Sequence, residues 1–214
     1  HDRYRRQRQM CIRDRYISDL VSWGAIGART AESQVHRELT SGLSCPVGIK
    51  NSTNGEYKPA IDAIKSAKYQ HVFLGATKQG KVAIFKTSGN DDTHLILRGG
   101  KNPNYDKGSV HACVKCLSES NINSNIMVDF SHGNSQKNHE NQAKVCSSIC
   151  SQIANGNKNI VGVMIESNLQ AGNQKISNQM EYGKSITDAC VDFEETKVFL
   201  ENLSTAVQKR REIG

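Results

Sequence analysis

Apolar residues of this 214-residue chain gather in five short continuous runs, and each run ends in a polar or charged residue. The runs cover residues 23–29, 46–50, 94–98, 126–132 and 160–166. Continuous apolar runs, as opposed to alternating ones, are typical of strands that are covered on both faces, as in parallel sheets. Segments with helical periodicity separate the runs, so the pattern predicts an α/β fold.

Four helices are expected between and after these runs. Apolar residues at 60–67, 110–117 and 145–153 recur at the spacing of a helix that buries one face. The last helix is expected from Phe193 to Arg211, because Asp192 and Glu195 have capping-box spacing and three basic residues stand at its end.

A β-hairpin is expected between the second and third runs. Residues 71–75 and 81–85 are short apolar segments joined across a turn at Gly80. This hairpin interrupts the alternation of strands and helices. We therefore interpret it as an insertion with a regulatory or interface role.

Composition and charge exclude several classes of protein. The chain is 36% hydrophobic and 23% charged, which favours a folded domain. Its net charge of +7 is concentrated in residues 1–15, which hold six Arg against two Asp, and the chain has few aromatic residues. Nucleic-acid binding is therefore not expected. The longest wholly apolar run, Ile160–Ile165, is far shorter than the roughly 20 residues that cross a membrane.

The seven cysteines are odd in number and mostly scattered, and no apolar secretory segment follows the basic start of the sequence. Reduced thiols and a cytoplasmic location are therefore expected. The pairs Cys113/Cys116 and Cys146/Cys150 have helical spacing on apolar faces. This spacing predicts buried thiols and not a zinc site, which would need two further ligands.

Side chains suited to anions or metals end all five runs, and a sixth follows the last run in a glycine-bearing loop; they are Arg29, Lys50, Arg98, His132, Glu166 and Asp188. A single charged residue at a strand end needs no function, because the chain there emerges into water. A charged or ligating residue at the end of every run does suggest a function, because parallel α/β folds bind their ligands where the carboxyl ends of the strands meet.

The set divides into two groups by chemistry. The three cations can fix phosphate or carboxylate groups. His132, Glu166 and Asp188 offer one nitrogen and two oxygens, which suits a divalent Mn, Fe, Co or Zn ion. The sequence therefore predicts an anionic substrate beside a Lewis acid.

At these residues the sequence strongly resembles the type I 3-deoxy-D-arabino-heptulosonate 7-phosphate synthases. The resemblance includes Trp-Gly-Ala-Ile-Gly-Ala-Arg at 23–29, Asp-Phe-Ser-His-Gly-Asn-Ser at 129–135 and Tyr-Gly-Lys-Ser-Ile-Thr-Asp at 182–188. Further stretches carry it from Tyr16 almost to the C-terminus, at 33–39, 42–48, 96–101 and 162–167.

The resemblance implies a partial (β/α)8 barrel, with about five of its eight strands, and an inserted hairpin. It also implies the first step of the shikimate pathway, in which phosphoenolpyruvate condenses with D-erythrose 4-phosphate and inorganic phosphate is released. Carried over by position, Ala28, Arg29, Lys50 and Arg98 bind phosphoenolpyruvate. His132, Glu166 and Asp188 become three ligands of a divalent metal, and Lys50 and His132 the catalytic residues.

Two motifs of the family are absent from this sequence. One is a Gly-Pro-Cys-Ser motif with a fourth metal ligand, and the other is a Lys-Pro-Arg-Thr motif that grips erythrose 4-phosphate. Both lie upstream of Tyr16 in the family. We therefore interpret residues 16–214 as the C-terminal part of the synthase domain and residues 1–15 as an artefactual basic segment, with a native basic arm as the alternative. Alone, such a chain is expected to be inactive and prone to aggregate, because an open sheet has two unpaired edges.

The hairpin also has a counterpart in the family, where a strand pair takes part in feedback inhibition by an aromatic amino acid. Leu43, Ser44, Phe73 and Gly75 match positions of that pocket. Gly75 stands where relatives carry Ser, so tyrosine is favoured over phenylalanine as the inhibitor. The intact enzyme is expected to be a homo-oligomer.

Two other functions remain open at this point. One is a different phosphosugar synthase or aldolase on the same barrel, which would consume another aldose. The other is a non-enzymatic protein that binds metal or nucleic acid, which requires the basic arm to be native.

Overall fold

The computed structural model describes residues 20–77 and 79–214. The predicted boundary between residues 1–15 and the synthase domain from residue 16 lies outside the described residues.

Five strands form one parallel sheet in the order β1 (Gly24–Ile26), β2 (Val47–Lys50), β5 (Thr93–Leu97), β6 (Ile126–Asp129) and β7 (Ile160–Met164). Each strand lies within or overlaps one of the predicted apolar runs, and all four pairings are parallel. The spatial order follows the chain order without a reversal, as in a (β/α)8 barrel and unlike a doubly wound sheet. The sheet is thus an arc of such a barrel, as predicted.

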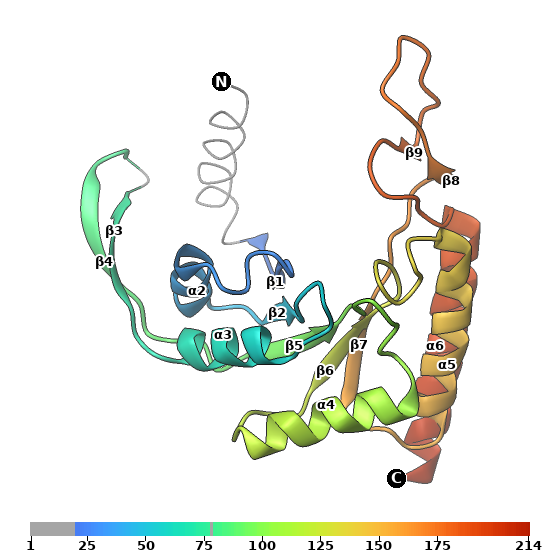
Figure 1. The fold of residues 1–214 in the computed structure, drawn as a ribbon, viewed down its shortest axis with the longest axis horizontal. Coiled ribbons are helices and arrows are strands. Elements are labelled where there is room, and N and C mark those ends of the chain that lie inside the picture. The colour runs from blue at the N-terminus through green and yellow to red at the C-terminus, as the bar shows by residue number, and fades with distance from the viewer. Residues whose placement is uncertain (1–19, 78) are drawn as a thin grey trace.

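Helices connect or follow these strands and cover the sheet (Figure 1). They are α2 (Gln34–Ser41), α3 (Lys58–Lys68), α4 (Lys107–Glu119), α5 (Gln142–Ala154) and α6 (Phe193–Ile213), with a short 3₁₀ turn at His139–Asn141. The core joins strand residues such as Ile49 and Leu95 to helix residues such as Ile64, Leu117 and Ile149. The last four helices are those that the periodicity predicts, and α2 is an addition to them.

The start of α6 confirms the predicted cap. The Asp192 carboxylate accepts a hydrogen bond from the Glu195 backbone N–H at 2.8 Å, which satisfies one of the free donors at a helix start.

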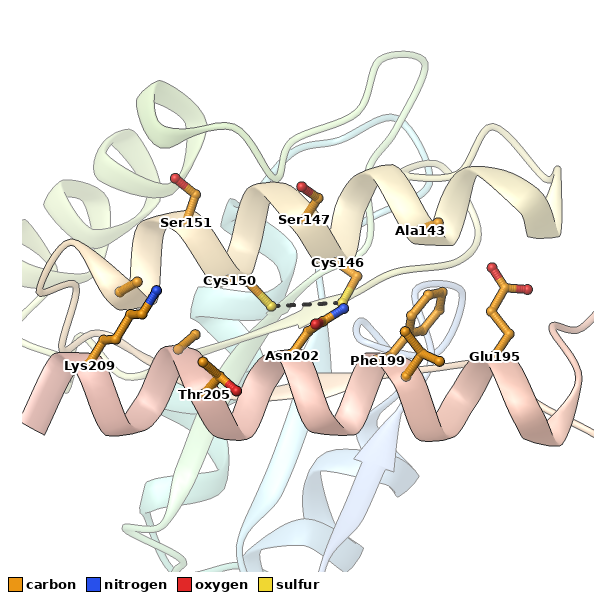
Figure 2. Close-up of a pocket in the computed structure, with 13 residues that line it drawn as sticks. Ala143, Cys146, Ser147, Cys150, Ser151, Glu195, Phe199, Asn202, Thr205 and Lys209 are labelled. Atoms are coloured by element: carbon orange, nitrogen blue, oxygen red, sulfur yellow. Dashed lines mark hydrogen bonds between the residues drawn. The ribbon is translucent and has the colours of Figure 1, made fainter.

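Helices α5 and α6 lie side by side, with a cavity of about 580 Å³ between them (Figure 2). The Sγ atoms of Cys146 and Cys150 face this cavity and are 3.8 Å apart. Cys113 and Cys146 are buried, and Cys116 and Cys150 are half-buried. The thiols therefore lie on apolar helix faces, as the spacing predicts.

The predicted hairpin is formed by β3 (Val72–Ala76) and β4 (Val82–Lys86), which pair antiparallel. It lies between β2 and β5 in the sequence. It extends away from the sheet and its helices (Figure 1). The rings of Phe73 and Phe85 stack on one face with their centroids 5.9 Å apart. The opposite face carries exposed aliphatic side chains, namely Val72, Leu74, Val82 and Ile84.

A second small sheet was not expected from the sequence. Strands β8 (Gln170–Asn173) and β9 (Lys184–Ser185) pair parallel after β7, and a bridge joins Ser167 to Val191. This pairing folds the 182–188 segment back toward the end of β7. Among the residues that the structure describes, no helix is both long enough and apolar enough to span a membrane.

Candidate active site

A cavity of about 460 Å³ lies at the carboxyl ends of the parallel strands. All six side chains singled out at the strand ends line it: Arg29, Lys50, Arg98, His132, Glu166 and Asp188. Ala28 lines it as well. The larger cavity between α5 and α6 contains none of these residues. The structure therefore brings the predicted site residues together in one place.

Each of these residues comes from a different strand or loop. Lys50 is the last residue of β2, Arg98 follows β5 directly, and His132 follows β6 after a two-residue interval. Arg29 and Glu166 follow β1 and β7, and Asp188 lies between β9 and α6. Because neighbouring parallel strands end at the same edge, residues far apart in the sequence become neighbours.

The cationic side of the cavity consists of Arg29, Lys50 and Arg98. Burial lowers the pKa of Arg98, and the nearby Arg29 charge lowers it further, against the opposite effect of Asp129. Lys50 is only 12% exposed, and its Nζ donates a hydrogen bond to Asp129 Oδ2 at 2.7 Å. The charges of Arg29 and Arg98 repel each other, and Lys50 lines the same cavity, so the arrangement favours a bound anion.

A network of buried amides holds the loops that carry these cations. Asn51 Oδ1 accepts a hydrogen bond from the Arg98 backbone N–H at 2.8 Å, and Asn104 Oδ1 accepts one from the Gly99 N–H at 2.7 Å. Asn134 Oδ1 accepts from the Asn104 N–H at 2.8 Å. The loops after β2, β5 and β6 are thereby joined, and the site is held by satisfied buried polar groups.

Glycine is required where these loops touch. A Cβ at Gly133 would lie 2.8 Å from the Gly100 nitrogen, and a Cβ at Gly100 would lie 2.5 Å from the Gly55 nitrogen. Only residues without a side chain allow the backbones to approach so closely.

His132, Glu166 and Asp188 line the same cavity, and their ligand atoms all lie within 4.8 Å of one another. His132 Nε2 is 3.6 Å from Glu166 Oε1. Metal–ligand distances are about 2.0–2.2 Å for nitrogen and carboxylate oxygen, so small side-chain rotations would let one ion contact all three groups. The donor set and its spacing therefore fit a divalent ion.

Neighbouring residues fix two of these groups. The Ser131 hydroxyl donates a hydrogen bond to Glu166 Oε2. The buried Nδ1 of His132 lies 2.8 Å from Asp129 Oδ2. His132 itself has a φ of 52°, a left-handed conformation that non-glycine residues adopt mainly at turns and functional sites.

Asp129 is a fully buried carboxylate at the end of β6. Burial alone would raise its pKa, but the His132 and Lys50 contacts outweigh burial and hold the pKa of Asp129 below its usual value. The group is therefore an anion beside both halves of the site.

Several residues near the site were not predicted. Asp129 and Ser131 stand within the 129–135 motif, so the motif was the available signal. Thr30, Thr53 and Lys137 also line the cavity, and Gln142 hydrogen bonds to Glu166. Polar residues in loops are common, and no spacing in the sequence distinguishes these.

The candidate feedback residues lie away from this cavity. Leu43 and Ser44 are in the connection from α2 to β2, and Phe73 and Gly75 are on β3. A Cβ at Gly75 would lie 2.8 Å from the Phe85 ring. The space that Gly75 provides is therefore taken by Phe85, and this ring would have to shift before a larger inhibitor could use it.

Comparison with known proteins gives one consistent result. The profile of the DAHP synthetase I family matches residues 11–201. The Phe-sensitive phospho-2-dehydro-3-deoxyheptonate aldolase of Escherichia coli K12 is 54% identical over 202 residues, which cover 94% of this chain and 58% of that protein. The Trp-sensitive enzyme of Salmonella typhimurium LT2 is 50% identical over 201 residues, which cover 93% and 58%.

A solved structure agrees with these relatives. The phospho-2-dehydro-3-deoxyheptonate aldolase from Francisella tularensis SCHU S4 is 55% identical and superimposes with a TM-score of 0.89, over 92% of this chain and 58% of that one. The chain thus spans less than two thirds of the length of the relatives it matches.

Proposed function

This chain belongs to the DAHP synthetase I family, and on that premise we propose that it carries the phosphoenolpyruvate and metal sites of a 3-deoxy-7-phosphoheptulonate synthase. The proposed reaction condenses phosphoenolpyruvate with D-erythrose 4-phosphate to 3-deoxy-D-arabino-heptulosonate 7-phosphate and phosphate. The observation that supports it most is that one cavity is lined both by three cations and by the clustered His132, Glu166 and Asp188.

The cations bind phosphoenolpyruvate in this proposal. Arg29 and Arg98 offer planar guanidinium groups that can each form two parallel hydrogen bonds to a phosphate or carboxylate. Lys50 adds a point charge, and the backbone at Ala28 lies beside them. Together these groups hold the enol phosphate still and in position for attack, which lowers the entropic part of the barrier.

His132, Glu166 and Asp188 hold the divalent ion, which we expect to be Mn, Fe, Co or Zn. When bound, the ion supplies a Lewis acid that polarises the aldehyde oxygen of erythrose 4-phosphate. The side chains of Ser131 and Gln142 keep Glu166 directed at the same point.

The chemistry follows from this placement. Carbon 3 of the enol attacks the aldehyde carbon of erythrose 4-phosphate and forms the new carbon–carbon bond. Water then adds at carbon 2, and one of its protons goes to the oxygen of the former aldehyde. The bond between carbon 2 and the phosphate oxygen breaks, the other proton leaves with the phosphate, and carbon 2 becomes a ketone. Lys50 and the two arginines balance the charge on the phosphate as it leaves.

Regulation and assembly complete the proposal. We expect an aromatic amino acid to inhibit the intact enzyme, with tyrosine favoured over phenylalanine, through Leu43, Ser44, Phe73 and Gly75. Relatives named as Phe-sensitive and Trp-sensitive support aromatic feedback in general. We also expect a homo-oligomer in the cytoplasm, where the six described free thiols would stay reduced.

A chimeric enzyme tests the proposal. Residues 20–214 would replace the matching part of the Phe-sensitive E. coli relative, and phosphate release from phosphoenolpyruvate would be measured with Mn²⁺. Release that requires erythrose 4-phosphate and disappears in His132→Ala is the expected result. A folded chimera that consumes another aldose would contradict it. Should the chimera not fold, calorimetry of phosphoenolpyruvate and Mn²⁺ binding to this chain, kept soluble and folded as a maltose-binding-protein fusion, decides, and a folded fusion that binds neither refutes the proposal.

A further inference from the structure

Asp129 contacts a predicted substrate-binding residue and a predicted metal ligand with the same oxygen atom. Its Oδ2 lies 2.7 Å from Lys50 Nζ and 2.8 Å from His132 Nδ1. Its Oδ1 accepts a hydrogen bond from the Ser131 backbone N–H at 2.9 Å. One carboxylate at the end of β6 is therefore joined to β2, to its own loop and to both halves of the cavity.

This carboxylate is fully shielded from solvent. An ionised group at such a site is costly unless charged partners and hydrogen bonds surround it. Lys50 and His132 are those partners, and the backbone N–H of Ser131 completes the set. The two side chains are consequently held at fixed positions relative to each other, because each must approach one small, immobile anion.

The contact also determines which ring nitrogen of His132 is available to bind a metal. Nδ1 of His132 lies 2.8 Å from Asp129 Oδ2, and Nε2 lies 3.6 Å from Glu166 Oε1. A metal-binding histidine commonly donates its second ring N–H to a carboxylate, which fixes the tautomer and the ring orientation. Asp129 itself lies on the Nδ1 side, so it is not a ligand of an ion at Nε2.

We propose that Asp129 is a positioning residue that serves both functions of the cavity, by directing Nε2 of His132 at the metal and Nζ of Lys50 at phosphoenolpyruvate. This inference rests on the proposed function. It adds to that function a physical link between substrate binding and metal binding through one shared oxygen atom. A purely structural ion pair would stabilise the fold without linking them.

Calorimetry on this chain, kept soluble as a maltose-binding-protein fusion, tests the proposal. Asp129→Asn keeps the size of the side chain and removes its charge. We expect it to weaken Mn²⁺ binding by about 10- to 100-fold and to weaken phosphoenolpyruvate binding measured without metal. The matched control is Asp62→Asn, because Asp62, on α3, also pairs with a lysine, Lys58, at 2.9 Å but does not line the cavity. The control should leave both affinities unchanged.

A double-mutant cycle separates positioning from stability. If Asp129 acts on phosphoenolpyruvate through Lys50, Asp129→Asn should have no further effect on phosphoenolpyruvate binding in a Lys50→Met background. Additive losses would overturn the proposal, as would an Asp129→Asn chain that binds both ligands like the wild type. A wild-type chain that binds neither ligand would refute the proposed function itself, and this inference with it.

A spectroscopic measurement on the wild type does not depend on the folding of any variant. With Zn²⁺ bound to ¹⁵N-histidine-labelled chain, the His132 signals should show the metal on Nε2 and a proton on Nδ1. The loss of these signals in His132→Gln assigns them. Metal bonded to Nδ1 would overturn the proposal, because Asp129 could not then hold that nitrogen.

Discussion

The side-chain amide of Gln142 makes two hydrogen bonds with the main chain of Glu166. Gln142 Nε2 donates a hydrogen bond to the Glu166 carbonyl at 3.0 Å, and Gln142 Oε1 accepts one from the Glu166 N–H at 3.1 Å. Gln142 is fully buried at the first position of α5, and Glu166 follows β7. The helix therefore holds the backbone from which a proposed metal ligand extends.

Replacing Gln142 with leucine should weaken both the fold and metal binding. Each buried backbone group left without a partner costs about 1–3 kcal/mol, and Glu166 loses its fixed position. Chemical denaturation and Mn²⁺ calorimetry measure the two effects. Gln152→Leu is the control, because Gln152 lies on the same helix and donates to the Tyr105 carbonyl at 2.8 Å, away from the cavity. It should lower stability only. Wild-type Mn²⁺ affinity in Gln142→Leu would disprove this role of the amide.

Substitutions on the two sides of the cavity should separate metal binding from substrate binding. His132→Ala should abolish Mn²⁺ binding. Arg98→Ala should weaken phosphoenolpyruvate binding roughly 10- to 150-fold and retain Mn²⁺, because a hydrogen bond to a charged group contributes about 1.5–3 kcal/mol. Arg37→Ala is the control, since Arg37 Nε donates to the Ala31 carbonyl at 2.9 Å outside the cavity. If His132→Ala keeps its Mn²⁺ affinity, the ligand assignment is wrong.

The periodicity of apolar residues predicted the strands and most helices, because burial on both faces leaves a continuous apolar signal. It did not predict where strands end. The run 126–132 extends past β6, which stops at Asp129 because the backbone turns to reach a left-handed His132. Helix α2 was also missed, since its buried residues Thr40 and Ser41 are polar. Strand β8 is mostly exposed, and neither β8 nor β9 contains a large apolar residue, so the pair has no apolar pattern to detect.

The six side chains at the strand ends were predicted as a set, because parallel strands bring their carboxyl ends together. Their supporting contacts were not. Asp129 stands in a motif, but its burial and its contacts with Lys50 and His132 depend on how β2 and β6 lie in the sheet. The sequence contains no sign that Gln142 would face Glu166, 24 residues away.

Removal of the cap of α4 should lower stability in a pH-dependent way. The Asp106 carboxylate accepts a hydrogen bond from the Ser109 N–H at 3.0 Å, and the Ser109 hydroxyl and this N–H lower the pKa of Asp106 below its ordinary value of 3.8. Asp106→Ala should therefore cost about 1 kcal/mol of unfolding free energy at neutral pH.

A carboxyl whose pKa is lower in the folded than in the unfolded chain stabilises the fold. Its contribution is complete above the unfolded-state pKa and is lost as the pH falls through the folded-state pKa. The difference between wild type and Asp106→Ala should thus shrink only below about pH 3.8. Denaturant titrations at stepwise lower pH measure it. Asp106→Asn, which keeps a capping oxygen, should resemble the wild type at neutral pH. A constant difference at every pH would contradict the role of the charged carboxylate.

The Cys146 thiol, which faces the cavity between α5 and α6, should be unreactive in the folded chain. Burial, together with Cys150, raises the pKa of Cys146 to about 12. Because the thiolate is the nucleophile, iodoacetamide should label Cys146 very slowly at neutral pH and rapidly after unfolding in guanidinium chloride. Mass spectrometry of the labelled peptides measures both rates. Equal labelling in the two states would show that the thiol is exposed or ionised.

Phosphoenolpyruvate and a divalent ion should occupy the same cavity, side by side. The most direct test is the ³¹P signal of phosphoenolpyruvate in the presence of this chain and Mn²⁺, because paramagnetic broadening falls steeply with distance. With wild type the signal should broaden beyond its width in the same Mn²⁺ without the chain, and this extra broadening should be absent in His132→Ala and in Arg98→Ala. Phosphoenolpyruvate that binds without extra broadening, or extra broadening that persists in His132→Ala, would contradict this placement.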